Sequence, residues 1–183
     1  RSLPDPREQI IDLGSGPLGA QIAVTWHFFH ETFDKIDPVI SYVLRDAVKK
    51  QILDPYLHAG SFEQNWWLGF KLKPRQVVNN WNVWCNADVI LCFLLMEKDP
   101  DRLNYALKQS ARSVDRFLEY IKTDGACEEG PAYWGHAAGK LYDYLQIMHD
   151  ASGGKFSFFD VKQIRDMGEY ISRSYVQDGW VVN

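Results

Sequence analysis

Cysteine is scarce in this sequence, and its scarcity excludes a disulfide framework. The chain has three cysteines, Cys85, Cys92 and Cys127, which cannot all pair with one another and lack the paired spacing of a metal site. Cys85 and Cys92 lie seven positions apart on one predicted helix, roughly 10 Å, which is too far for a disulfide. We therefore expect no metal ion and no cofactor in this region of the protein.

Long apolar runs and an excess of positive charge are also missing. The longest apolar run, 89–96, is far shorter than the roughly 18 residues that a membrane span needs. Lysine and arginine number 20 against 24 acidic residues, so the formal net charge is −4, and neither nucleic acid nor an anionic membrane is an expected partner. No signal peptide is visible. The sequence begins at Arg1 rather than methionine, and we expect a processed or cut N-terminus.

Hydrophobic and aromatic residues, by contrast, are abundant, at 46% and 14% of the chain. That composition suits a well-buried globular core, and 183 residues correspond to about one domain. Hydrophobic positions recur with a helical period, which predicts an all-α fold of three helical hairpins. The predicted hairpins cover 17–58, 81–122 and 131–177.

The second helix of each hairpin begins in a similar way. Asp37-Pro38 and Asp99-Pro100 each place an N-cap aspartate before a proline at the first helical position, and Asp160 is the third expected cap. The caps stand at positions 37, 99 and 160, a spacing of 62 and then 61 residues. A near-constant period is typical of helical-hairpin arrays, so we predict an α/α toroid whose inner helices are more buried than its outer ones. Three hairpins do not close a ring, and we expect an incomplete toroid that is part of a larger protein.

The stretch from Asp124 to His136 gathers acidic, aromatic and basic side chains around a predicted helix start. Gly130-Pro131 reads as a turn followed by the first helical position. Such a start followed by a polar face is typical of a cleft wall, although the same residues also suit a core with satisfied hydrogen bonds. Gly135 and Gly139, one turn apart, predict a close backbone approach. The side chains that share one face at helical spacing are Tyr133, His136, Lys140 and Tyr144.

The helix predicted from about residue 81 has a polar beginning and an apolar remainder. Buried polar groups cost free energy unless they are hydrogen-bonded. The polar side chains at its start therefore either cap the helix and hold its start in place by hydrogen bonds, or they face a polar cavity. They are Asn79, Asn80, Asn82, Asn86 and Asp88.

The preceding segment, 61–80, has no clean period and interleaves aromatic with basic residues. A loop of about twenty residues inside a compact domain is usually functional. Two interpretations remain open: an anionic sugar that stacks on the aromatic rings and pairs with the basic groups, or a packed loop with a solvated basic rim. The aromatic residues are Trp66, Trp67 and Phe70, and the basic ones are Lys71, Lys73 and Arg75.

Two motifs stand out along the chain. The first is Asn79-Asn80-Trp81-Asn82, and the second is Asp124-Gly125 followed by Glu129-Gly130-Pro131-Ala132-Tyr133-Trp134. Together they resemble the heparinase II/III-like family of polysaccharide lyases. The resemblance implies an incomplete α/α toroid followed by an antiparallel β-sandwich domain, with the substrate cleft between them. It also implies a periplasmic or secreted bacterial protein whose partner is an acidic polysaccharide.

The reaction that this resemblance implies is β-elimination at a uronic acid. A base removes the C5 proton, α to the carboxylate, and an acid protonates the leaving glycosidic oxygen. The carboxylate must be neutralised for that proton to leave, and the resemblance assigns this role to Asn80 and the proton transfer to Tyr133. His136 and Lys140 are candidates for the positive charge that helps a tyrosine act as base. The expected substrate-binding residues are Asn79, Trp81, Asn82, Trp84, Glu129, Trp134, Lys140 and Trp67.

Trp81 departs from the family pattern, because the well-studied lyases often carry histidine there. The identity of the base and the type of substrate, glycosaminoglycan-like or alginate-like, are therefore open. Two other classes of function also fit the sequence. A glycoside hydrolase on a similar α/α barrel would use carboxylates such as Asp88, Glu128 and Glu129 as acid and base. A non-catalytic carbohydrate-binding protein would use tryptophans as stacking platforms, namely Trp66, Trp67, Trp81, Trp84 and Trp134.

Overall fold

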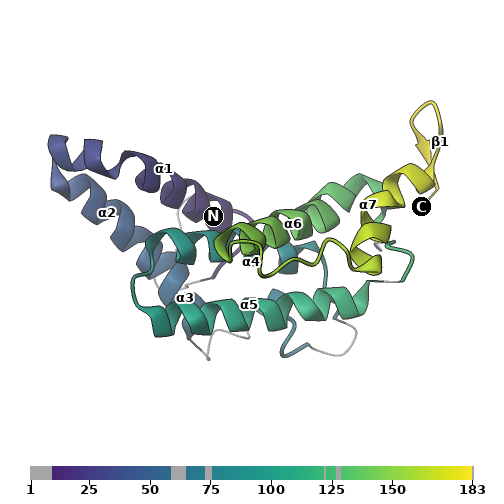
Figure 1. Cartoon of the computed structure of the whole chain (residues 1–183), viewed down its shortest axis with the longest axis horizontal. Coiled ribbons are helices and arrows are strands. Elements are labelled where there is room, and N and C mark those ends of the chain that lie inside the picture. Colours follow the sequence, from purple (N-terminus) through teal and green to yellow (C-terminus); the bar gives the residue numbers. More distant parts are fainter. Residues whose placement is uncertain (1–9, 59–64, 73–75, 122, 127–128, 183) are drawn as a thin grey trace.

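The computed structural model describes residues 10–58, 65–72, 76–121, 123–126 and 129–182. This part of the chain is almost entirely helical, which confirms the predicted all-α class, with one small antiparallel hairpin (Figure 1). The helices are α1 (Ser15–Ile36), α2 (Pro38–Val48), α3 (Asp54–Leu57), α4 (Asn80–Met96), α5 (Pro100–Tyr120), α6 (Gly130–Ala151) and α7 (Lys162–Ser174). A π-helical turn (Lys49–Leu53) follows α2, a 3₁₀ turn (Trp66–Leu68) precedes α4, and the strands are β1 (Tyr175–Gln177) and β2 (Trp180–Val181).

Helix starts follow the predicted capping chemistry in two of three cases. The carboxylates of Asp37 and Asp99 each accept a hydrogen bond, at 2.9 Å, from the backbone N–H two residues further along. These bonds satisfy N–H groups that have no partner within the helix. α7 differs, because Val161 occupies its N-cap position and no side chain caps it. The prediction that Asp160 caps this helix is therefore wrong.

α4 is the centre of the fold. It packs against α1, α5 and α6, which lie around it in Figure 1. Twelve of its 17 residues are buried, compared with six of 21 in α5. Its second half is apolar on all sides, and Ile90 and Phe93 are fully buried. Cys85 and Cys92, also on α4, are buried and unpaired as predicted, and burial raises the pKa of both thiols.

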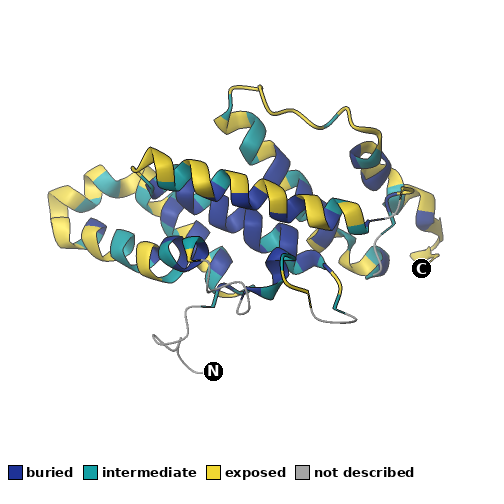
Figure 2. Ribbon diagram, turned by 90° about the horizontal axis from the view of Figure 1, so that it is seen from below, coloured by how far each residue is buried: buried dark blue, intermediate teal, exposed yellow. Residues whose placement is uncertain are grey.

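The predicted contrast between buried inner helices and less buried outer helices holds for α4 alone. Four of 22 residues are buried in α1 and six of 22 in α6, proportions close to those of α2, α5 and α7. Buried residues concentrate in the middle of the molecule (Figure 2), so the helices beside α4 bury mainly the side that faces it. The prediction was therefore wrong for α1 and α6.

The hairpin of α1 and α2 extends beyond this core (Figure 1, upper left). Its outer part carries large apolar side chains that are exposed over half or more of their surface. Contiguous exposed apolar surface is typical of an interaction site. The exposed residues are Phe28, Phe29, Ile36, Val39, Tyr42 and Val43.

The asparagines inside α4 bind it to its neighbours. Asn82 and Asn86 are both fully buried. The Asn82 amide donates to the Trp67 carbonyl at 2.9 Å and to the Ser113 hydroxyl at 3.1 Å, and the Asn86 amide donates to the same hydroxyl at 2.9 Å. Asn86 in turn accepts a hydrogen bond from the Tyr56 hydroxyl at 2.8 Å. These two asparagines therefore hold α4 to its neighbours rather than face a polar cavity, because their partners lie on α3, α5 and the turn before α4.

Candidate functional site

The beginnings of α4 and α6 lie next to each other, and the Glu129 carboxylate joins them. Its Oε1 accepts a hydrogen bond from the Asn80 N–H at 3.0 Å. The Asn79 side chain caps α4 by accepting from the Trp81 N–H at 3.2 Å. A carboxylate at a helix N-terminus is favourable, because the unsatisfied N–H groups there carry partial positive charge. The two sequence motifs are thus brought together in space.

One turn further along, side chains from both helices form a row on the surface. The imidazole of His136 stacks on the Trp84 indole, with ring centroids 4.8 Å apart and planes at 13°. The Tyr133 ring meets the same imidazole edge-on, with a centroid distance of 5.5 Å. Lys140 Nζ lies 5.6 Å from the centre of the Trp84 ring. We call these four residues, together with Asp88 beneath them, the α4–α6 face.

The upper part of the α4–α6 face is open to solvent, since 53% of Tyr133 is exposed. Tyr144 was expected on the same face of α6, and that expectation is wrong. Its side chain lies in the core at 4% exposure, with its hydroxyl 3.0 Å from the Ser110 hydroxyl of α5. Tyr144 has nearly the same helical phase as Tyr133, but at its level the side chain reaches the core and Ser110 of α5.

Two glycines of α6 also border open space. No other atom lies within 4 Å of a Cβ built at Gly135 or at Gly139. The predicted close backbone approach at these glycines is therefore wrong within the part of the chain that the structure describes. A glycine inside a helix costs roughly 1 kcal/mol relative to alanine. Because no contact of the described residues offsets that cost, the space beside α6 is available to a substrate or to another part of the protein.

Asp88 is the buried acid of the α4–α6 face. Only 7% of the residue is exposed, and its Oδ2 has no hydrogen-bond partner among the described residues. Its Oδ1 lies 4.0 Å from Lys140 Nζ. Burial raises the pKa of this carboxyl to about 6, while Lys140 acts to lower it and Asp143 to raise it. A carboxyl group with such a pKa, paired with a partly exposed lysine, is typical of a functional site.

The raised pKa of Asp88 predicts a pH dependence of stability that Asp88→Asn removes. The folded state holds this proton more tightly than the unfolded chain, whose ordinary carboxyl pKa is 3.8. Stability is therefore lost as the pH rises from about 4 through about 6, by roughly 3 kcal/mol. We expect the unfolding free energy of the wild type to fall by about that amount relative to Asp88→Asn between pH 4 and pH 7. Urea titrations at each pH measure the difference, and two parallel curves would contradict the burial of a charged Asp88.

Three of the expected substrate-binding residues make hydrogen bonds within the protein. Trp67 is 1% exposed and its indole N–H donates to the Ile11 carbonyl at 2.8 Å. Asn82 belongs to the buried network described above. The Trp134 indole N–H donates to the Met167 carbonyl at 2.9 Å and so ties α6 to α7. These hydrogen bonds help to hold the elements of the fold together.

Other predicted residues keep access to solvent or fall outside the described part of the chain. Trp81 and Trp84 are partly exposed, and the Trp81 ring lies 5.5 Å from that of Trp66. Asn80 is 4% exposed, and its backbone N–H binds Glu129 at the junction between α4 and α6. Glu128, Cys127, Lys73 and Arg75 lie outside the described residues. The pairing of Asp88 with Lys140 was not anticipated, because the two residues lie on different helices and only packing brings them together.

The described chain thus defines a helical-hairpin protein with a Tyr–His–Lys row on its surface. No protein-family model matches the sequence, and no curated protein is significantly similar to it. None of the described helices is both long and apolar enough to cross a membrane. Within the same residues, no cluster of three or more histidine, cysteine, aspartate or glutamate side chains is arranged to hold a metal ion.

Proposed function

We propose that this protein is a polysaccharide lyase that cleaves a uronic-acid-containing polysaccharide by β-elimination. The observation that carries the proposal is the row of Tyr133, His136 and Lys140 on the α4–α6 face. A phenol hydroxyl and two basic groups on one exposed surface suit proton transfer next to a negatively charged sugar. The resemblance of the two sequence motifs to heparinase II/III-like lyases supports the same reaction.

In this mechanism Tyr133 reacts as the phenolate, and its oxygen takes the C5 proton of the uronic acid. The electron pair of the C5–H bond forms the C4–C5 double bond as the C4–O bond breaks, and the proton passes to the leaving glycosidic oxygen. Positive charge near the sugar carboxylate stabilises the transition state, because negative charge builds up next to that group. We assign this role to His136, Lys140 and Asn80. Lys140 Nζ also lies 3.1 Å from Asp143 Oδ2 and 4.0 Å from Asp88 Oδ1.

The scaffold we propose is an incomplete α/α toroid that meets further protein. Its support is the central position of α4 between α1 and α6, with α5 packed on a further side. The exposed apolar tip of the α1–α2 hairpin and the open glycines of α6 are surfaces suited to contact with another hairpin or a β-sandwich domain. A polymeric acidic substrate agrees with a periplasmic or secreted location.

Analysis of the products tests this proposal. The full-length protein is incubated with glycosaminoglycan-type and alginate-type polymers, and ultraviolet absorbance is followed. Elimination leaves an unsaturated, absorbing sugar at the new non-reducing end, so absorbance rises with each cleavage. New reducing ends without absorbance would overturn the lyase assignment, and so would tight binding of every polymer without turnover.

A glycoside hydrolase is the second candidate, and one observation favours it. The pKa of Asp88 is raised to about 6 by burial, which is the property of a general acid in inverting and retaining hydrolases. Such an enzyme also needs a second carboxyl group about 5–9.5 Å away, across the scissile bond. The appearance of saturated products, lost in Asp88→Asn, would establish this alternative.

A further inference from the structure

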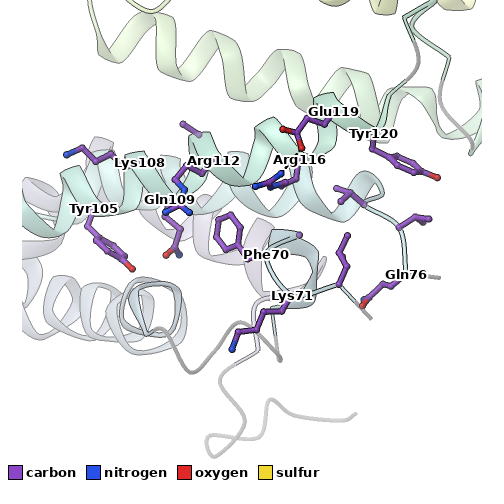
Figure 3. A pocket seen from close by; sticks show the side chains of 15 residues that line it. Phe70, Lys71, Gln76, Tyr105, Lys108, Gln109, Arg112, Arg116, Glu119 and Tyr120 are labelled. Carbon is purple, nitrogen blue, oxygen red and sulfur yellow. Dashed lines mark hydrogen bonds and ion pairs between the residues drawn. The ribbon is translucent and has the colours of Figure 1, made fainter. Parts of the chain in front are cut away.

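A groove runs along the outer side of α5, away from the α4–α6 face. Its volume is about 1230 Å³, and it lies between α5 and the residues 69–72 and 76–78 (Figure 3). Neither the helix spacing nor the loop composition alone locates it, because its two walls come from separate parts of the chain.

One wall of the groove is a stripe of side chains on α5. Tyr105, Lys108, Arg112 and Arg116 recur every three or four residues and therefore project from one side of the helix. Successive members four positions apart are separated by about 6 Å along the axis. The facing segment adds Lys71 to the lining.

The charge of the groove is opposite to that of the chain. Four of its lining residues are basic and one, Glu119, is acidic, in a protein of net charge −4. Glu119 forms an ion pair with Arg116 at 2.8 Å, and both side chains are at least half exposed. Such an exposed pair holds its partners only weakly, so the groove keeps a net positive charge.

The groove is already formed without a ligand, because contacts between its two walls hold them in place. Gly69 has φ of +76°, and a Cβ built there would lie 3.1 Å from Arg116 Cβ, so glycine lets the segment approach α5 closely. The Arg112 guanidinium lies 5.5 Å from the centre of the Phe70 ring. Beneath them the Gln109 amide donates to the Tyr56 carbonyl at 2.7 Å and is buried. A binding surface that is already formed loses less entropy when it binds.

A second cavity lies next to the groove. A smaller cavity of about 160 Å³ shares Val77, Val78 and Tyr120 with it. Asn79 and Glu129 line the same small cavity, and Glu129 binds the start of α4. The basic groove and this small cavity therefore adjoin the same three residues.

We propose that this groove binds a stretch of an acidic polysaccharide, at a site separate from the α4–α6 face. Carboxylate or sulfate groups on successive sugars pair with Lys108 and Arg112 through charge-assisted hydrogen bonds. The exposed ring of Tyr105 offers apolar surface to a sugar face. That the bound chain is also the substrate of this protein rests on the proposed lyase function. Binding of an acidic glycan in the groove does not depend on that function.

The test compares the affinity of full-length variants for a size-defined uronic-acid oligosaccharide by calorimetry. Lys108→Glu combined with Arg112→Glu should weaken binding at least about tenfold, since two charge-assisted contacts become repulsive. Lys35→Glu combined with Lys155→Glu changes the net charge equally at exposed positions outside the groove, and its affinity should stay within about twofold. Equal loss in both variants would overturn the proposal. Lys108→Gln with Arg112→Gln repeats the measurement without charge reversal if the first variant does not fold.

Two further measurements distinguish carbohydrate binding in the groove from general attraction of anions and from catalysis. Single-stranded DNA of matched charge should bind more weakly than the oligosaccharide. If the wild type binds both equally and the groove variant loses both, the carbohydrate assignment is overturned. Tyr133→Phe should retain oligosaccharide binding, because Tyr133 lies outside the groove. If the wild type forms no unsaturated product while the groove variant alone loses binding, the groove proposal stands and the lyase proposal fails.

Discussion

Tyr133→Phe should reduce turnover of a uronic-acid polymer by about 100-fold or more, with little change in binding. The substitution removes only the hydroxyl group that we propose carries the proton, and a positioned acid or base contributes about 10²–10⁴-fold. The ring keeps its contact with His136. Because 53% of Tyr133 is exposed, the melting temperature should stay within about 2 °C of the wild-type value. Steady-state rates of ultraviolet-absorbing product and thermal melts measure the two effects.

Tyr175→Phe is the matched control for this experiment. Tyr175 is 54% exposed, almost the same as Tyr133, but it lies on β1 outside the α4–α6 face. Its turnover should equal that of the wild type. A fully active Tyr133→Phe protein would remove this residue from the mechanism. A fall in both turnover and melting temperature would instead indicate a structural role.

Gly125→Ala should destabilise the protein by about 3 kcal/mol or more, the largest stability effect we expect from one methyl group. Gly125 has φ of +81°, a conformation that costs other residues about 1–2 kcal/mol. A Cβ there would lie 2.5 Å from Met167 N and 2.6 Å from the Asp166 carbonyl group. These are backbone atoms of α7, which cannot rotate away as a side chain would, so overpacking adds about 1–3 kcal/mol. Chemical denaturation measures the loss.

Gly153→Ala measures the cost of the backbone conformation without the cost of overpacking. Gly153 also has positive φ, +62°, but no other atom lies within 4 Å of a Cβ built there. Its cost should be limited to the backbone term of about 1–2 kcal/mol. If the two alanine variants lose the same stability, the close approach of the segment before α6 to α7 does not exist as described.

The helical elements could be predicted from the sequence because the interactions that define them are local. The caps at Asp37 and Asp99 depend on a carboxylate and an N–H group two residues away, and both were correct. The apolar second half of α4 predicted a helix buried on all sides, and α4 is the centre of the fold. The cap expected at Asp160 failed, since α7 begins after Val161.

Burial of individual polar and aromatic side chains could not be predicted in the same way. Tyr133 and Tyr144 have nearly the same helical phase, yet one is 53% and the other 4% exposed. Trp67 and Asn82 looked suited to a sugar, but they are buried because the carbonyls of Ile11 and Trp67 offer them hydrogen bonds across the fold. Each outcome depends on which neighbour covers the residue.

The sequence by itself therefore determined the all-α class, the order of the helices and the burial of α4, because helical period and capping act over a few residues. It also singled out Tyr133, His136 and Lys140 as one face of a helix. Only the tertiary structure decided that Asp88 lies beneath that face with a raised pKa, and that residues 69–72 and 76–78 line a basic groove together with α5. Desolvation and groove shape arise between elements distant in the chain, so packing alone sets them.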